Sequence, residues 1–147
     1  MKFVIQRVKN ASVEVEEKVI GKINHGLLVF VGVSNDDTVQ IADKMIKKLI
    51  GLRIFEDEDG KANVDIKTVS GEMLIISQFT LYADTKDGNR PAFVKAMNPV
   101  EASKLYDLFN EELRTYDIEV LTGQFGADMK INLLNDGPVT IIYDENL

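Results

Sequence analysis

Polar and apolar positions alternate along the first third of the chain, as expected of strands with one buried face. Residues 12–16 alternate strictly between valines and polar side chains. Residues 27–33 are apolar at every position except one glycine, which is typical of a central strand covered on both faces. Later segments of strand length complete the pattern: residues 72–76, 118–121, 129–134 and 139–143.

Two longer segments have the apolar spacing of amphipathic helices. In residues 41–50 the apolar positions form one stripe, Ser34–Asp37 offers N-caps before it, and Gly51 follows as a C-cap. The second helix begins with Asn98 as N-cap and Pro99 at the favoured first position. Many strands and two main helices on one side predict an α+β fold with a curled antiparallel or mixed β-sheet, or a barrel.

Length and composition fit one globular domain that spans residues 1–147. No apolar run approaches the roughly 20 residues of a membrane helix, and the first residues lack the layout of a signal peptide. With no cysteine, the chain has no disulfide, thiol nucleophile or thiolate metal site. We therefore expect a cytoplasmic protein with no membrane association.

The charges of the chain narrow its partners and its metal chemistry. A formal net charge of −7 argues against general nucleic-acid binding, although a small site could still hold one end of a nucleic acid. In the acidic stretch 56–60 the carboxylates are adjacent rather than alternating, so it is a solvated turn and no metal site is expected.

Two interruptions of otherwise apolar runs are the candidate functional segments. The run that ends at Ile76 breaks into Ser77-Gln78-Phe79-Thr80, and Gly137-Pro138 divides the apolar run 131–142. Because proline donates no ladder hydrogen bond, it is normally kept out of central strands. Polar groups at a strand edge and a simple hairpin bend would also explain these segments, but together they suggest a site built largely from main chain.

A hydroxyl nucleophile is disfavoured, because Ser77 or Thr80 would need a general base. The only imidazole belongs to His25, in an Asn-His-Gly turn where a plain turn residue is the simpler interpretation. The alternative is a pocket of backbone N–H groups and the Gln78 amide aimed at a carbonyl oxygen. One such donor contributes about 3 kcal/mol in the transition state, which suffices for an activated ester.

Other side chains fit either a structural role or a ligand contact. Phe125 and Met129 flank a glycine-rich segment and suit a core or a pocket. Two groups of basic side chains are most simply solvent-exposed surface residues, but they are also the candidate contacts for phosphate. These are Lys86, Arg90 and Lys95, and Lys44, Lys47 and Lys48.

Taken in order, the motifs of this chain resemble the D-aminoacyl-tRNA deacylase family, also called D-tyrosyl-tRNA deacylase. The similarity runs nearly end to end, and although each motif alone is weak, the ordered set is specific. The motifs are residues 6–8, 11–13, 26–29, 52–57, 77–84, 88–93, 123–129 and 135–140.

The resemblance implies a metal-independent ester hydrolase without cofactors. Its substrate would be tRNA whose 3′-terminal adenosine carries a D-amino acid or mischarged glycine. The family is homodimeric, and Ser77, Gln78, Phe79 and Thr80 would line a site at the subunit interface that holds the ester and the adenosine.

The resemblance also implies how L-amino acids are excluded. The Gly137-Pro138 peptide would be cis, would enter the partner's site and would reject L-side chains sterically. Phe125 and Met129 would line the same pocket, and Arg7 would brace the Gly-Pro segment. Two other classes stay open: a non-catalytic binding module for RNA ends or small ligands, and a serine esterase for small molecules.

Overall fold

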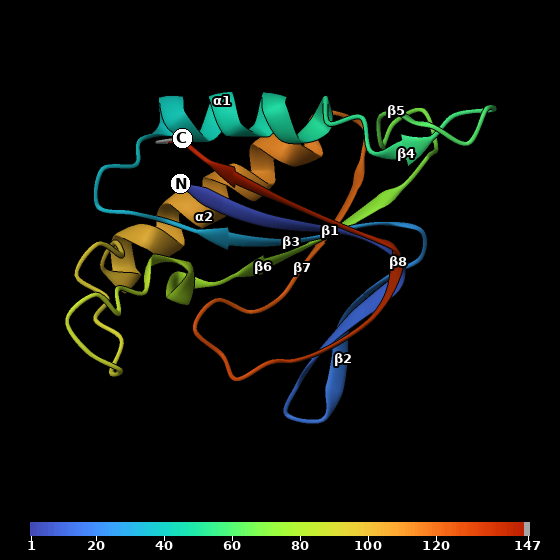
Figure 1. Ribbon diagram of the computed structural model, residues 1–147. Helices are drawn as coiled ribbons and strands as arrows, with labels where there is room; N and C mark the ends of the chain where they lie inside the picture. The colour runs from blue at the N-terminus through green and yellow to red at the C-terminus, as the bar shows by residue number, and fades with distance from the viewer. Residues whose placement is uncertain (146–147) are drawn as a thin grey trace.

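The long first strand, β1 (Lys2–Val15), is the centre of a strongly curled sheet in the computed structural model, which describes residues 1–145 (Figure 1). One edge of β1 pairs antiparallel with β8 (Lys130–Asp144) along nearly its whole length. The other edge pairs first with β3 (Gly26–Gly32) and then with β2 (Lys18–Ile23), both antiparallel. β1 is therefore covered on both edges, while β8 pairs with no other strand among residues 1–145.

The sheet continues from β3 into two parallel strands. β6 (Glu72–Ser77) pairs with β3, and β7 (Glu119–Thr122) pairs with β6. β2 bends back against β7, so closely that a Cβ on Gly21 would lie 3.4 Å from the Thr122 carbonyl oxygen. The sheet is thus mixed and nearly closed, as the sequence predicted.

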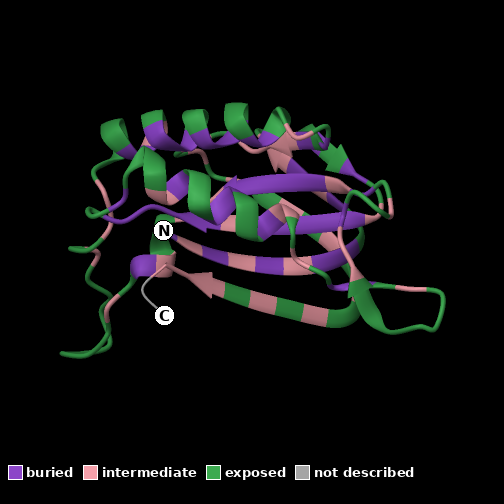
Figure 2. Cartoon of the chain, turned by 90° about the horizontal axis from the view of Figure 1, so that it is seen from above, coloured by how far each residue is buried: buried purple, intermediate pink, exposed green. Residues whose placement is uncertain are grey.

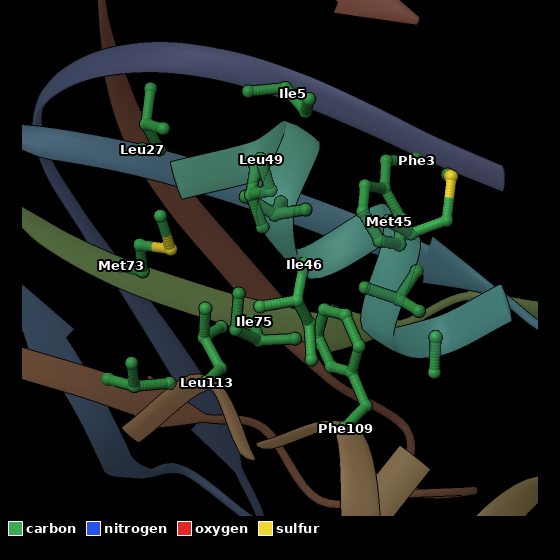
Figure 3. Close-up of a cluster of buried hydrophobic side chains, with 14 of the residues drawn as sticks. Phe3, Ile5, Leu27, Met45, Ile46, Leu49, Met73, Ile75, Phe109 and Leu113 are labelled. Atoms are coloured by element: carbon green, nitrogen blue, oxygen red, sulfur yellow. The ribbon is translucent and has the colours of Figure 1, made fainter. Parts of the chain in front are cut away.

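Both helices, α1 (Val39–Ile50) and α2 (Pro99–Arg114), lie on the same side of this sheet (Figure 1). Their apolar stripes pack against the outer face of the curled sheet, in a core where Phe3 and Phe109 pack edge to face at 5.5 Å (Figure 3). The other labelled side chains come from both helices and from β1, β3 and β6: Ile5, Leu27, Met45, Ile46, Leu49, Met73, Ile75 and Leu113. A second cluster fills the inside of the curled sheet: Val8, Ala11, Val13, Ile23, Leu28, Leu74 and Ile76.

The helix ends agree with the sequence at two of the three caps that it predicted. Asn98 accepts a hydrogen bond from the Glu101 N–H with Pro99 at the first position, and Gly51 caps α1. The N-cap of α1 is Thr38 and not a residue of 34–37, so this prediction was wrong. The reason is that the Asp37 carboxylate is occupied, buried against the Met1 ammonium and accepting from the Ser34 N–H.

The remaining elements are short. β4 (Phe55–Glu56) and β5 (Ala62–Val64) form a small hairpin, and the 3₁₀ turn η1 (Phe79–Tyr82) follows β6. The apolar segments 129–134 and 139–143, predicted as separate strands, are the two halves of β8. Within residues 1–145, neither helix is long and apolar enough to cross a lipid bilayer.

Candidate functional site

A cavity of about 560 Å³ opens at the carboxyl ends of the parallel strands β3 and β6. Its walls come from these strand ends, from η1, from the start of α2 and from the loop between β7 and β8. Most of the lining is apolar, with the polar groups confined to a few side chains and the main chain, as is typical of a small-ligand site. The lining includes Val31, Val33, Ile76, Ser77, Gln78, Phe79, Phe93, Ala96, Met97, Asn98, Pro99, Ala102, Phe125, Gly126, Ala127, Asp128, Met129 and Ile131.

The polar wall of the cavity is the turn that ends β6. The Gln78 N–H donates to the Val31 carbonyl at 2.8 Å, and the chain then leaves the sheet as η1. η1 crosses β3 at Gly32, where an added Cβ would lie 3.0 Å from the Leu81 Cβ and 3.2 Å from the Gln78 carbonyl oxygen. The glycine at position 32 therefore allows the turn to pack over the end of β3.

Two backbone donors at the start of η1 are without acceptors. The N–H groups of Phe79 and Thr80 bond to no carbonyl or side chain among residues 1–145, whereas the next N–H, that of Leu81, donates to the Gln78 carbonyl. The first N–H groups of a helical turn lack intrahelical partners, so they are free to bind an anionic oxygen.

The side chains of the same segment divide between the cavity and the solvent. Ser77, Gln78 and Phe79 line the cavity, but Thr80 is exposed and does not. The Gln78 amide donates to the Thr80 hydroxyl at 2.5 Å, so in this structure it is engaged locally. Phe125 and Met129 also line the cavity, and at the same time both pack against the buried core clusters, so each has both positions that the sequence left open.

Among residues 1–145, Asp128 is the only titratable side chain that lines the cavity with Ser77, and its carboxylate is exposed and paired with the Lys130 ammonium at 3.0 Å. His25 precedes β3, whereas the cavity lies at the other end of that strand, roughly 20 Å away for seven residues. Its imidazole instead approaches the Asp136 carboxylate at 3.8 Å. Burial raises the pKa of Tyr82 and raises the pKa of Tyr106 to about 12, so both phenols stay protonated at neutral pH.

Tyr106 connects α2 to the cavity wall. Its hydroxyl donates to the Ile75 carbonyl at 3.0 Å, and its ring packs against the ring of Phe125 at 5.7 Å. The phenol therefore fixes the end of β6 and one apolar wall.

We expect Tyr106→Phe to change how stability depends on pH. Below pH 10 the variant should be less stable by about 1 kcal/mol, because the Ile75 carbonyl loses its partner. The folded pKa of Tyr106, about 12, exceeds its unfolded value of 10.0, so its contribution is complete below pH 10 and is lost as the pH rises towards 12. Over that range the wild type should lose roughly 1.4 kcal/mol per pH unit that the variant keeps, so the difference of about 1 kcal/mol is cancelled by about pH 11 and reversed above it. Urea unfolding at about pH 8 and about pH 11 measures this, and a constant difference between the proteins would contradict it.

The second candidate segment lies elsewhere, on the edge strand β8. The Gly137-Pro138 peptide is cis, and the stretch from Asp136 to Val139 bulges opposite Arg7, since Gln6 pairs with Thr140 and Val8 with Asn135.

Arg7 is buried and fixes this bulge by hydrogen bonds. Its Nε donates to the Asp136 carbonyl at 3.0 Å, and its Nη1 donates to the Ile54 carbonyl at 2.6 Å. Gly137 has φ +130°, and a Cβ there would lie 3.2 Å from the Arg7 Nη2. The Asp136 carboxylate also faces Lys9 at 3.7 Å, so the base of the segment is strongly charged.

Within one chain the two segments do not meet. β1 and β3 lie between β8 and β6, which separates them by roughly 14 Å along the sheet. In addition, Arg7 pairs with Leu27 near the start of β3, whereas the cavity begins at Val31 near its end. Gly137 and Pro138 are therefore absent from the cavity of their own chain.

Phe93, Met97 and the first residues of α2 also line the cavity, and no motif in the sequence indicated a site role for them. Phe93 packs edge to face against Phe79 at 4.9 Å. The available signal was the Gly-Asn-Arg-Pro-Ala-Phe motif, which indicated only the resemblance. Among residues 1–145, no group of three or more His, Asp or Glu side chains is arranged to hold a metal ion.

Comparison with known proteins identifies a family and solved structures of the same fold. A family model described as D-Tyr-tRNA(Tyr) deacylase matches residues 4–144. A solved structure described as a c-Myc DNA unwinding element binding protein is 40% identical, with a TM-score of 0.92 and 98% of each chain covered. Another, described as a probable eukaryotic D-amino acid tRNA deacylase, is 17% identical, with a TM-score of 0.82 and 97% of each chain covered; at that identity the likeness shows the fold.

Proposed function

Because the chain belongs to the D-Tyr-tRNA(Tyr) deacylase family, and is therefore an ester hydrolase of translation quality control, we propose that two copies build each active site together. In this arrangement the cavity of one subunit holds the terminal aminoacyl-adenosine of a tRNA. The Gly137-Pro138 segment of the other subunit closes the cavity. Since translation takes place in the cytoplasm, that is where we expect the enzyme to act.

The observation that carries this proposal is the separation of Gly137-Pro138 from the cavity of its own chain. The segment lies on the unpaired edge of β8, where it is free to reach another subunit. β8 alternates exposed and half-exposed residues along its length (Figure 2), and Leu134 and Ile142 are 55% and 60% exposed. Because long edge strands with exposed apolar side chains are normally covered, β8 suits the interface of a two-fold dimer.

Stereoselectivity would follow from sterics. The carbonyls of a rigid Gly-Pro segment offer no side chain to adapt, so they leave room on one side of the α-carbon and exclude a substituent on the other. Glycine has no side chain to exclude, so glycyl esters should also be accepted.

Hydrolysis would need little from protein side chains. A water oxygen attacks the ester carbonyl carbon, the bond to the ribose 3′-oxygen breaks, and that oxygen leaves with a proton. The free N–H groups of Phe79 and Thr80 would stabilise the oxyanion, each contributing about 3 kcal/mol, or 10²–10³ in rate. The ribose 2′-hydroxyl of the substrate would orient or activate the water.

The chiral assay tests the function as a whole. We expect D-tyrosyl-tRNA and glycyl-tRNA to be hydrolysed and L-tyrosyl-tRNA to be left intact. A binding module would cleave none of them, and an unselective esterase would cleave D- and L-esters alike.

One relative is described as a c-Myc DNA unwinding element binding protein, so duplex DNA can be added to the same assay as a competitor. The net charge of −7 predicts that duplex DNA inhibits the hydrolysis only weakly.

Thr80→Ala separates main-chain catalysis from a covalent route. We expect near-normal kcat, within about threefold, because the Thr80 hydroxyl is exposed and only accepts from Gln78, while the backbone N–H remains. Single-turnover hydrolysis of D-tyrosyl-tRNA gives the rate. A loss of several orders of magnitude would instead identify Thr80 as the nucleophile.

The same measurement with tRNA ending in 2′-deoxyadenosine tests the role of the substrate hydroxyl. We expect a large loss of rate with unchanged binding. Equal turnover of the deoxy and the natural substrate would exclude substrate assistance.

A further inference from the structure

The loop between η1 and α2 carries three cations without partners beside the cavity. In this segment, called here the 84–97 loop, Lys86, Arg90 and Lys95 are exposed, and none forms an ion pair within residues 1–145. Three cations and two carboxylates give the loop a charge of +1. Since the net charge of the chain is −7, the rest of the chain carries −8. The loop is therefore a basic region on an acidic protein.

The loop is ordered by hydrogen bonds at both ends. Asp84 and Ala92 exchange two backbone bonds of 2.8 Å each. Near the other end, Asn35 donates its backbone N–H to the Lys95 carbonyl at 3.0 Å and its side-chain amide to the Val94 carbonyl at 2.7 Å. The cations are thus presented from a fixed base.

Exposed apolar groups lie next to these cations. Phe93 and Phe79 line the cavity together, and Phe79 is 56% exposed. Val94 is 81% exposed, between Phe93 and Lys95. Aromatic surface combined with a basic groove is the usual means of holding a single-stranded nucleic acid, whose bases stack while its phosphates pair with lysine and arginine.

The other basic group, on α1, suits this role less well. Lys44 pairs with Glu145 at 3.3 Å, and the Lys48 ammonium lies over the ring of Tyr143 at 5.4 Å. None of the α1 lysines lines the cavity. The α1 group therefore has fewer free cations and no continuity with the site.

We propose that the 84–97 loop docks the single-stranded 3′ end of the tRNA as it enters the cavity. Lys86, Arg90 and Lys95 would contact the phosphates that precede the terminal adenosine, and Phe93 and Val94 would contact the unpaired bases. This inference rests on the function proposed above and names the surface by which that site selects an RNA end rather than a free ester. Figure 1 shows the loop in yellow-green and yellow beside η1, at the opposite end of the molecule from β4 and β5.

The test compares two substrates in the variant Lys86→Ala/Arg90→Ala/Lys95→Ala. For D-tyrosyl-tRNA we expect kcat/KM to fall about tenfold or more at low salt, mainly through KM. For D-tyrosyl-adenosine, which lacks the preceding phosphates, we expect no change. The dependence of tRNA cleavage on salt should also weaken: at a slope of about 0.7 per phosphate, three lost contacts reduce the slope by about 2, or roughly 15-fold between about 50 and about 200 mM.

Two variants serve as controls for charge. Lys18→Ala/Lys22→Ala removes exposed lysines from β2, none of whose residues lines the cavity, and should leave both substrates unchanged. Lys44→Ala/Lys47→Ala/Lys48→Ala alters the net charge as much as the loop variant does, and tests the rival surface on α1.

The outcomes separate the inference from the function that it assumes. Unchanged tRNA cleavage in the loop variant, equal losses on both substrates, or a larger loss in the α1 variant would each overturn the docking surface. If the wild type cleaves neither D-tyrosyl-tRNA nor D-tyrosyl-adenosine, the proposed deacylase activity itself fails.

Discussion

Gly137→Ala should reduce kcat/KM for D-tyrosyl-tRNA by about 100-fold or more, since a displacement of about 1 Å near the reacting atoms commonly has an effect of that size. At φ +130° the backbone of residue 137 is in a region that L-residues rarely adopt. The added Cβ would lie 2.9 Å from Val139 Cγ2 and 3.1 Å from the Val139 nitrogen. The Gly-Pro segment therefore has to move, and with it the proposed wall of the partner's site. Steady-state kinetics on D- and L-tyrosyl-tRNA measures both the rate and the selectivity.

The control for this variant is Gly60→Ala. Gly60 also has positive φ, +74°, but nothing lies within 4 Å of an added Cβ there. It should lose stability through backbone strain, about 1 kcal/mol, and keep its activity. Equal activity of Gly137→Ala and Gly60→Ala would remove the Gly-Pro segment from the site.

Leu134→Lys on β8 should convert the enzyme to an inactive monomer, with a loss of activity of about 100-fold or more. Leu134 is 55% exposed in the single chain, so lysine there should change the stability of the fold by no more than about 0.5 kcal/mol. In a dimer built on β8, however, the same change places a charge in the middle of an apolar contact, which costs several kcal/mol. Sedimentation velocity and D-tyrosyl-tRNA hydrolysis should report the two losses together.

Leu108→Lys gives the matched control. Leu108 lies on the outer side of α2 and is 49% exposed, so the chemical change and the starting exposure are nearly the same. This variant should remain dimeric and active. If Leu134→Lys is monomeric and yet fully active, the site does not depend on a second subunit.

Local sequence signals were sufficient for the helices and for much of the cavity. Asn98 and Pro99 mark the start of α2 because capping depends on neighbouring residues alone. The break after Ile76 likewise indicated the turn that carries Ser77, Gln78 and Phe79 into the cavity.

The features that the sequence did not predict correctly depend on contacts between segments that are far apart in the chain. The N-cap of α1 was misassigned because Asp37 is bound by the first residue of the chain. The orientation of Thr80 away from the cavity depends on how η1 crosses β3. The distance between Gly137-Pro138 and Ser77 follows from the order β8-β1-β3-β6, and alternation of polar and apolar residues carries no information about strand order.

The central claim, that each site combines the cavity of one subunit with the Gly-Pro segment of the other, is tested most directly by mixing two inactive variants. One is Gly137→Ala. The other blocks the cavity by Ala127→Trp, which adds a large ring to a lining position. In heterodimers of the two, one of the two sites has an intact cavity and an intact Gly-Pro segment. After subunit exchange at equal concentrations, D-tyrosyl-tRNA hydrolysis should therefore return to about a quarter of the wild-type rate, as random pairing in a two-fold dimer predicts. No recovery, in a mixture shown to contain heterodimers, would mean that each subunit builds its site alone and would contradict the account.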